Sequence, residues 1–566
     1  MYVKITRSGP RRYVQLVESF RDENGQVKKR TVATLGRVDQ MDGALDSVIN
    51  GLLKVAGHAP MARKAAPPEV IFESARALGD VWTLTEIWKE LGFDELRRVF
   101  GRTRRTTDVE ALIRVMVFNR LCDPESKLGV LRWLETVTMP GIEAESITHQ
   151  QLLRSMDALM DHRHDVDEVV ARLLRPLIDQ DLSVVFYDMT TIRSEGLATV
   201  AGDVRKFGMS KEGLVARQFM LGVVQTAEGL PIYHEVFDGN VGETKTLLPT
   251  LAKVLERYPN VRRLILIADR GLLSLDNLEA LQAIRLPQGQ PMEFIIAVPG
   301  RRYNEFTDLL DAFHRGQCAG AAQEVVGEQC WNALRLIVAH DPVTAAVQRQ
   351  RRDERIDTLI TQGERWAGKL TDQDGGTPFR GRKLSDSGVK ARFYHAVCEA
   401  HLNRIIKVDL SSDLFSYTLD DKALDLARMM DGKLLLVTNA PDLSPTDVVA
   451  RYKSLADIER GFRVLKSELE IGPVYHRLPE RIRAHAQICF IALILYRVMR
   501  SRLRAADTGL SPERALQQLQ RIQHHRVRLN DAEPISGVSS INQQQSEVFS
   551  ALHVKKPGTP QQLNLL

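Results

Sequence analysis

The chain has 566 residues, of which 44% are hydrophobic and 26% are charged. This composition is ordinary for a soluble globular protein, so a large core is possible, and the length corresponds to about three to four domains. The net charge is only +5, from 77 basic and 72 acidic residues, and does not by itself indicate a nucleic-acid-binding protein.

The first fifty residues alternate between apolar and polar in the manner of strands. A turn at 23–26 separates two such runs, 13–18 and 30–35, so residues 1–50 are expected to form a basic β-hairpin unit. A linker is expected at 57–68, where glycine and prolines gather. Residues 70–178 follow with apolar positions at helical spacing, which predicts a helical domain.

Two stretches are rich in basic residues: 1–30, and 97–120 with seven arginines against Asp108 and Glu110. Such patches can neutralise DNA phosphates, so the helical domain is a candidate DNA-binding domain. The alternative is an ordinary solvated charged surface. The five cysteines form no CxxC pair, which argues against a disulfide framework or a zinc knuckle.

The pattern changes at residue 181, where short and continuously apolar runs begin, as in strands covered on both faces. Strands are expected at 183–188, 219–225, 232–237, 263–269 and 294–298, and helices at 246–258 and 274–284. This is the opening order of a ribonuclease-H-like α/β domain, so 181–300 is assigned as the first part of a catalytic core. Periodicity alone does not separate it from other mixed α/β folds.

Residues 301–430 are mixed, with strand-like runs at 333–339 and 392–397 and Gly-rich breaks, and are interpreted as an insertion. Residues 431–505 complete the core with a strand at 433–437 and two long helices, 445–470 and 480–503. The longest apolar run, 488–496, is about half of the roughly 20 residues that cross a bilayer, so no membrane partner is expected. Residues 506–566 form a polar, Gln-rich C-terminal region without assigned elements.

Two acidic residues end buried strands, Asp188 after VVFY and Asp269 after LILIA. Ligand sites in open α/β sheets form at the carboxyl ends of strands, so both carboxylates are placed where chemistry occurs. The alternative is that each aspartate caps a following turn or helix.

A third carboxylate lies on the expected helix 445–470. At about 100° per residue, Glu459, Arg463 and Lys466 fall within about 40° of Tyr452, and an apolar stripe of Leu455, Ile458, Phe462, Leu465 and Leu469 lies beside them. This places an ionic row at the edge of the buried face, where a cleft would be. The alternative is a surface ion pair between Glu459 and Arg463.

Three carboxylates without histidine or cysteine suit a hard, oxygen-preferring cation, above all Mg²⁺. Two such ions activate the attacking oxygen and stabilise the leaving oxygen in phosphoryl transfer. The sequence therefore predicts phosphodiester chemistry on two Mg²⁺ ions held by Asp188, Asp269 and Glu459, with Mn²⁺ expected to substitute. Tyr452, Arg463 and Lys466 are the candidate DNA-binding residues.

The motifs YDMTTI, HEVFDGNVGETKTL, ADRGLLSLDNL and IERGFRVLK resemble the DDE transposases of bacterial insertion sequences with a Tyr-Arg-Glu-Lys signature. The resemblance runs from about residue 140 to 500, and Tyr452, Glu459 and Lys466 have the signature spacing. Leu455 stands where the family has Arg, which puts one phosphate contact in doubt. Arg451, Lys453 or Arg463 could compensate.

The resemblance implies a ribonuclease-H-like fold with a β-rich insertion before the catalytic Glu. It also implies a metal-ligand role for Asp188, Asp269 and Glu459, and DNA contacts from Tyr452 and Lys466. The enzyme would cut double-stranded DNA at the terminal inverted repeats and join the freed 3′ hydroxyl to target DNA, as a homodimer in the bacterial cytoplasm, at the nucleoid. Trp331 and Trp366 are candidates for stacking a displaced base, or core residues.

Other functions stay open at this point. One is a nuclease of the same fold that does not transpose, and another is a non-catalytic DNA-binding derivative, for which Leu455 is the argument. A phosphatase of the haloacid-dehalogenase type would need a second Asp where Thr190 stands. A tyrosine recombinase using Tyr452 would need a cluster of arginines.

Overall fold

The structure is a computed structural model. It describes residues 1–41, 44–59, 69–101, 107–178, 183–196, 200–209, 215–242, 245–268, 275–286, 288–318, 320–375, 383–455, 462–530 and 532–558. The chain divides into two compact units, Met1–Glu73 with Val527–Ile535, and Ser74–Arg526 with Ser536–Leu566.

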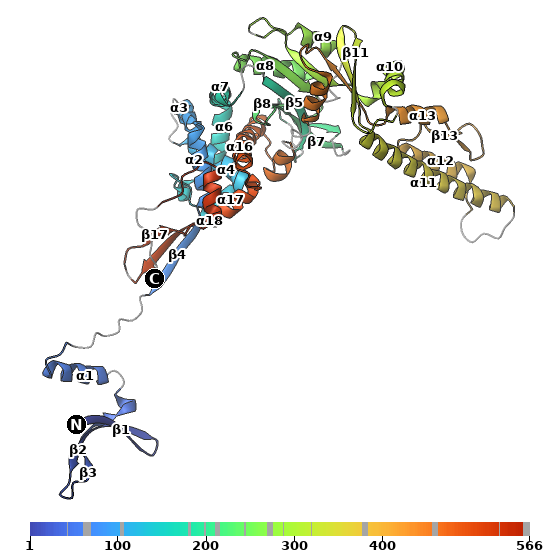
Figure 1. Ribbon diagram of the computed structural model, residues 1–566. Coiled ribbons are helices and arrows are strands. Elements are labelled where there is room, and N and C mark those ends of the chain that lie inside the picture. Colours follow the sequence, from blue (N-terminus) through green and yellow to red (C-terminus); the bar gives the residue numbers. More distant parts are fainter. Residues whose placement is uncertain are drawn as a thin grey trace. The chain divides into compact units, whose positions relative to one another are not determined.

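The first unit contains a three-stranded antiparallel sheet and a helix (Figure 1). Its elements are β1 (Tyr2–Ser8), β2 (Arg11–Arg21), β3 (Val27–Arg37) and α1 (Ala44–Val55). The expected hairpin is formed by β2 and β3, and the turn between them is held by Asp22, whose Oδ1 accepts hydrogen bonds from the backbone N–H groups of Asn24 and Gln26 at 3.1 and 3.0 Å. The boundary between the units falls within β4 (Val70–Ala77) and β16 (Gln523–Leu529), which form a sheet with β17 (Ile535–Val538).

The second unit begins with the expected run of helices. They are α2 (Gly79–Glu90), α3 (Leu96–Phe100), α4 (Val109–Cys122), α5 (Lys127–Thr136), α6 (His149–Asp161) and α7 (Arg163–Leu174). Side-chain caps begin three of them, where Asp108, Ser126 and Thr148 accept from backbone N–H groups of the first turn.

The interpretation of residues 97–120 as a solvent-facing basic patch is wrong for two of its arginines. Arg114 and Arg120 are buried, at 6% and 5% exposure. Arg114 lies 3.3 Å from the buried carboxylate of Glu110, and Arg120 donates to backbone carbonyls. These positions face inward because α4 packs against α6 and the long helix α16 (Pro479–Ala505). Arg102, Arg104 and Arg105 lie outside the described residues.

A nine-stranded mixed sheet forms the centre of the second unit, so the expected α/β class is confirmed. Its order is β11-β12-β15-β10-β9-β5-β7-β6, with β8 also paired to β7. The strands are β5 (Ser183–Arg193), β6 (Lys206–Met209), β7 (Val215–Thr226), β8 (Pro231–Asp238), β9 (Leu264–Ala268), β10 (Glu293–Ala297), β11 (Val325–Trp331), β12 (Leu334–His340) and β15 (Lys433–Thr438).

Three neighbouring strands, β5, β9 and β10, run parallel, and β7 and β15 flank them antiparallel. The chain order of strands and helices expected for residues 183–298 is confirmed, with β6 in addition. Helices α8 (Leu247–Arg257) and α9 (Leu275–Ala283) lie at the expected positions, and α10 (Thr307–Phe313) follows.

The β-rich character expected for residues 301–430 is wrong, because most of the segment is helical. It contains α11 (Pro342–Asp374), α12 (Asp386–Glu399) and α13 (Asp421–Met430), with a short hairpin of β13 (Ile406–Val408) and β14 (Tyr417–Leu419). These elements lie together beside the β11 edge of the sheet (Figure 1) and share a small core of their own, which includes Ile356, Phe393 and Val397.

The run 392–397 forms part of α12 and not a strand. Its β-prone residues mislead, because Val389, Phe393 and Val397 recur every four residues and are the buried positions of the helix. Two other strands of the segment, β11 and β12, belong to the central sheet.

The C-terminal region holds more regular structure than its polar sequence indicated. Besides β16 and β17 it contains α17 (Pro512–Gln520) and α18 (Gln543–Ala551), both with side-chain N-caps. Helix α16 is long and apolar enough to span a membrane, but 94% of its most apolar window is buried inside the protein. It is a core helix, packed against α4, α6 and β8.

Candidate active site

The two faces of the central sheet are covered by separate apolar clusters. One face carries the main core, which includes Val185, Tyr187 and Met189 of β5 and Phe462, Val464, Leu465 and Leu469. The other face carries a smaller cluster, here called the α14-side cluster, because helix α14 (Pro445–Lys453) packs there. It includes Val184 and Phe186 of β5, Ile265 and Ile267 of β9, and Val448, Val449 and Leu455.

Asp188 is half-buried on β5. Side chains alternate along a strand, so Asp188 continues the row of Val184 and Phe186 and lies on the α14-side face. Its Oδ1 accepts a hydrogen bond from the backbone N–H of Met189 at 2.6 Å. The predicted carboxylate therefore lies on the face of the sheet that α14 covers.

The opposite face fixes this part of β5. The hydroxyl of Tyr187 donates to Thr246 Oγ1 at 2.8 Å, next to the start of α8. Gly222 of β7 leaves room for this ring, since a Cβ there would lie 3.0 Å from the Tyr187 hydroxyl. The strand that carries Asp188 is thus held rigidly from behind.

The described part of the parallel β5–β9 pairing reaches Tyr187 and Ala268. Asp188 and Asp269 directly follow these two residues in the sequence. Asp269 and Glu459 lie outside the described residues. Among the described residues, no group of three or more His, Cys, Asp or Glu side chains is placed to hold a metal ion.

The single regular helix expected at 445–470 is wrong. Helix α14 ends at Lys453, and residues Val464–Glu468 form a π-helical turn, so a constant 100° per residue does not hold from Tyr452 to Lys466. The expected apolar stripe is divided as well, because Leu455 packs in the α14-side cluster and Phe462 in the main core. Tyr452 and Lys466 are half-buried, and Arg463 is exposed.

A buried ion cluster holds the loop that follows β5. Asp203 accepts from Arg205 at 2.9 and 2.8 Å and from Arg217 at 2.8 Å. The two arginines also donate to the carbonyls of Glu195 and Gly196. The cluster cannot be recognised from the sequence, because an Asp two residues before an Arg is a common pattern and Arg217 approaches Asp203 only in the folded chain.

The segment His234–Glu235, part of a motif between the two aspartates, is structural. His234 stacks on Phe490 with ring centroids 4.4 Å apart. Glu235 accepts from Tyr233, Lys253 and Arg163 at 2.6–2.7 Å. Burial raises the pKa of Glu235, but the charge of Arg163 and the three hydrogen bonds outweigh it and lower the pKa to about 2.

This lowered pKa makes stability depend on pH. A carboxylate with a depressed folded-state pKa stabilises the fold above its unfolded value of 4.5 and loses that contribution as pH falls toward about 2. We expect Glu235→Gln to lower the free energy of unfolding by up to about 3 kcal/mol at pH 7. This difference from the wild type should narrow below about pH 4.5. Urea unfolding at several pH values from 7 to 3 tests this. A difference in the free energy of unfolding that does not change with pH would contradict it.

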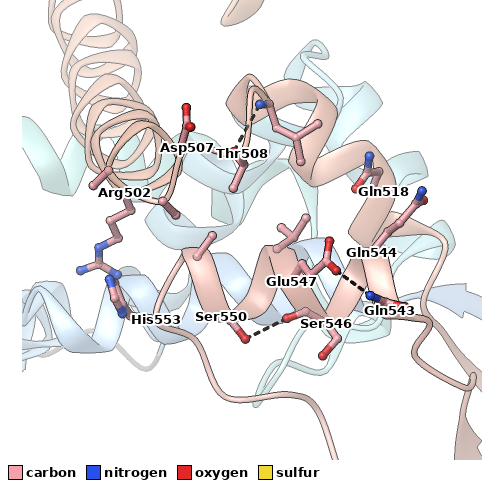
Figure 2. Close-up of a pocket in the computed structure, with 15 residues that line it drawn as sticks. Arg502, Asp507, Thr508, Gln518, Gln543, Gln544, Ser546, Glu547, Ser550 and His553 are labelled. Carbon is pink, nitrogen blue, oxygen red and sulfur yellow. Dashed lines mark hydrogen bonds between the residues drawn. The ribbon is translucent and has the colours of Figure 1, made fainter.

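A cavity of about 870 Å³ lies between the end of α16, α17 and α18 and is lined by polar residues such as Gln543, Gln544 and Glu547 (Figure 2). None of the predicted site residues that the structure describes lines it. Trp331 and Trp366 both contact phenylalanine rings, Phe306 and Phe393, which favours their interpretation as packing residues.

Family models match two parts of the chain. The model of the IS1634 family transposase N-terminal domain matches residues 3–63, and the model of the transposase DDE domain matches residues 179–495, more than half of the chain. The chain belongs to the insertion-sequence DDE transposase family. No curated protein matches the transposase. Among solved structures it is similar to a piggyBac transposase synaptic complex with hairpin DNA, at 9% identity over 78% of each chain and a TM-score of 0.38.

The structure explains the leucine at position 455 of this transposase. Leu455 is buried at 7% exposure in the α14-side cluster, among side chains such as Ile267. Of the residues considered as substitutes for the missing arginine, Lys453 pairs with Glu324 at 2.6 Å, and Arg463 is exposed.

We therefore expect Leu455→Arg to destabilise the transposase by about 2–4 kcal/mol, because it buries an unpaired charge among apolar side chains. Thermal unfolding checks this against Leu455→Met, which keeps the apolar volume. An arginine variant as stable as the wild type would show that position 455 can turn to solvent.

Proposed function

We propose that the transposase cuts double-stranded DNA at the terminal inverted repeats of its element and joins the freed 3′ hydroxyl to target DNA. In this proposal Asp188, Asp269 and Glu459 are the catalytic carboxylates. The observation that carries it is the position of Asp188, a half-buried carboxylate on the α14-side face of β5, directly after Tyr187, which pairs with Ala268 of β9.

The β5–β9 register supports the pairing of the two aspartates. Tyr187 and Ala268 are partners, so a ladder continued by one residue would set Asp269 opposite Asp188. In β9, Ile265 and Ile267 belong to the α14-side cluster, and the same alternation continued to Asp269 would put it on the face of Asp188.

The described neighbours of Glu459 support its place in the same site. On one side of it in the chain, Leu455 packs in the α14-side cluster. On the other side, Phe462 packs in the main core, and Val474 further along pairs with Ser194, just after the end of β5. In this proposal Glu459 lies where the chain passes from the Asp188 face of the sheet to the opposite face.

Three carboxylates without nitrogen or sulfur ligands form a donor set that fits Mg²⁺, and Mn²⁺ accepts the same oxygens. Two such ions, when bound, would activate the attacking oxygen and stabilise the leaving oxygen of the phosphodiester. The carboxylates would hold them, and Asp188, fixed by β5 and its Met189 hydrogen bond, would define the position of the cut phosphate.

Tyr452, Arg463 and Lys466 are proposed to bind the DNA near the site. If Lys466 contacts a phosphate, Lys466→Ala weakens binding to element ends and lowers the slope of log affinity against log salt by about one. Fluorescence anisotropy at several salt concentrations measures the slope. An unchanged slope would remove Lys466 from the DNA interface.

The fold proposed for the catalytic core, 181–300 with 431–505, is ribonuclease-H-like, with 301–430 inserted before the Glu segment. Residues 1–50 and 70–178 are proposed to bind the element ends, and 506–566 to complete the helical region. The working form would be a homodimer on paired ends, in the bacterial cytoplasm at the nucleoid.

Cleavage of a labelled DNA fragment that carries the gene's own flanks tests the proposed function. The control fragment has the same length with scrambled repeats. Nicks at the repeat borders of the first fragment alone are expected. Equal cutting of both fragments would instead favour a nuclease without transposition, and binding of the borders without cutting would favour a non-catalytic derivative.

A further inference from the structure

A second cavity, of about 480 Å³, lies beside the segment that follows the π-helical turn. It is formed by the end of α4, the start of α5, the start of α6, residues 470–476 and α16. The side chains that the argument uses are Arg120, Glu125, Lys127, Tyr475, His476 and His485.

Two cations in this cavity are buried without an acidic partner among the residues that the structure describes. Lys127 is 7% exposed and Arg120 is 5% exposed. Arg120 donates to the carbonyls of Leu469, Glu470 and Glu125, its Nε has no hydrogen-bond partner, and no hydrogen bond or ion pair within the described ranges involves Lys127 Nζ.

The carboxylates at the cavity do not neutralise these cations. Glu125 lies 3.9 Å from Arg132 and accepts from the Ser126 backbone N–H at 3.3 Å, and Glu470 is exposed. Neither forms an ion pair with Arg120 or Lys127 in the described part of the chain. A buried cation without a counter-charge destabilises the fold, so this arrangement is unfavourable unless an anion enters.

The pKa values of the neighbouring basic groups also reflect positive charge that is not neutralised. Burial, and next the charge of Arg120, lower the pKa of Lys127 to about 7. Burial lowers the pKa of His485 well below its usual value. The Nε2 of His485 lies 2.9 Å from the carbonyl of Ile471, while its buried Nδ1 has no partner.

Two further features match a nucleotide. Helix α5, ten residues long, begins at Lys127, so its positive end faces the cavity. At the cavity wall, Tyr475 leaves 71% of its surface exposed. An exposed aromatic ring beside buried cations is the arrangement that stacks a base while its phosphate is neutralised.

The cavity is connected to the proposed active site through β5. Val474 lies at the cavity and pairs with Ser194, which is six residues after Asp188. Six residues of strand span about 20 Å, so the cavity adjoins the far end of the strand that carries Asp188.

We propose that this cavity binds a backbone phosphate of a DNA strand that leads to the proposed active site, with Arg120 and Lys127 on the phosphate and Tyr475 on the adjacent base where that base is unpaired. The proposal rests on the proposed function, since it takes DNA as the substrate. It adds a binding site for one nucleotide beyond the catalytic carboxylates.

The first experiment measures DNA binding without divalent metal, so it does not depend on cleavage. It compares the wild type with Lys127→Met, Tyr475→Ala and Tyr475→Phe on a fragment carrying the element end. The control is Lys422→Met, which removes an exposed charge on α13. Lys127→Met should bind about tenfold more weakly and lower the salt slope by about one. Tyr475→Ala should lower the DNA affinity about fivefold to about 100-fold, and Tyr475→Phe should bind DNA with the affinity of the wild type.

Thermal unfolding separates binding from folding. Lys127→Met removes an unpaired buried charge, so its melting temperature is expected not to fall. A fall in affinity that is matched by a fall in melting temperature would overturn the proposal, and so would an unchanged salt slope in a stable Lys127→Met protein.

Inorganic phosphate identifies the source of the anion. At equal ionic strength, phosphate in place of chloride should raise the melting temperature of the wild type more than that of Lys127→Met. If phosphate discriminates the two proteins but DNA affinity does not, the site takes a free anion and the DNA assignment is overturned. If the variants show the expected losses of DNA affinity but the wild type does not cut at the repeat borders, the proposed function is overturned and the assignment of this binding site stands.

Discussion

Replacement of Asp188 by asparagine is expected to abolish DNA strand cleavage, by at least about 10³-fold, while DNA binding stays within about twofold of the wild type. Asparagine has nearly the same shape and keeps an oxygen to accept the hydrogen bond from the Met189 N–H. The strand should therefore stay in place, and the change removes only the negative charge that would hold a cation.

Single-turnover cleavage of a labelled end fragment measures this effect, with anisotropy for binding. Asp413→Asn is the matched control. It removes the same negative charge from an exposed side chain in the segment between α12 and α13. Cleavage by the Asp188 variant at the rate of the control would exclude Asp188 from the catalytic machinery.

The largest expected effect on folding comes from Asp203. Its carboxylate lies between Arg205, whose side chain is fully buried, and Arg217, whose side chain is 7% exposed. Burial raises the pKa of Asp203, but the hydrogen bonds and charges of these arginines keep it below its usual value. Removing one member of a buried ion cluster leaves the others uncompensated and destabilises the fold by about 3–5 kcal/mol.

Asp203→Ala should therefore lower the urea midpoint of the main unfolding transition strongly. The control is Asp311→Ala, which breaks the exposed pair with Arg315 and should cost less than about 1 kcal/mol. Because Arg205 and Arg217 also hold the carbonyls of Glu195 and Gly196, the loop after β5 should become more susceptible to proteolysis. Equal midpoints for the two variants would contradict a structural role of the cluster.

The sequence predicted the central strands well, because strands covered on both faces are continuously apolar. The positions of β5, β7, β8, β9 and β10 follow from such runs, and so does the place of Asp188 on β5. The parallel β5–β9 register, which aligns the ends of the two strands, was not predictable, since it depends on pairing between residues about eighty positions apart.

The segment 301–430 and the region around Glu459 were harder to predict for different reasons. In α12 the buried positions are Val389, Phe393 and Val397, whose residue types favour strands while their spacing favours a helix. In the Glu459 region the constant angular step of a regular helix fails, because helix α14 ends at Lys453 and a π-helical turn rotates the side chains that follow it. The burial of Arg120 is not predictable from local sequence, because it results from the packing of α16 on α4.

The most direct test of the three-carboxylate site is nicking of a labelled fragment that carries the gene's own flanks, with and without Mg²⁺, by the wild type and by Glu459→Gln. The proposal predicts nicks at the repeat borders that require the metal and that disappear in the variant, while both proteins bind the fragment equally. Metal-dependent nicking that persists in Glu459→Gln would contradict the assignment of Glu459 as the third ligand.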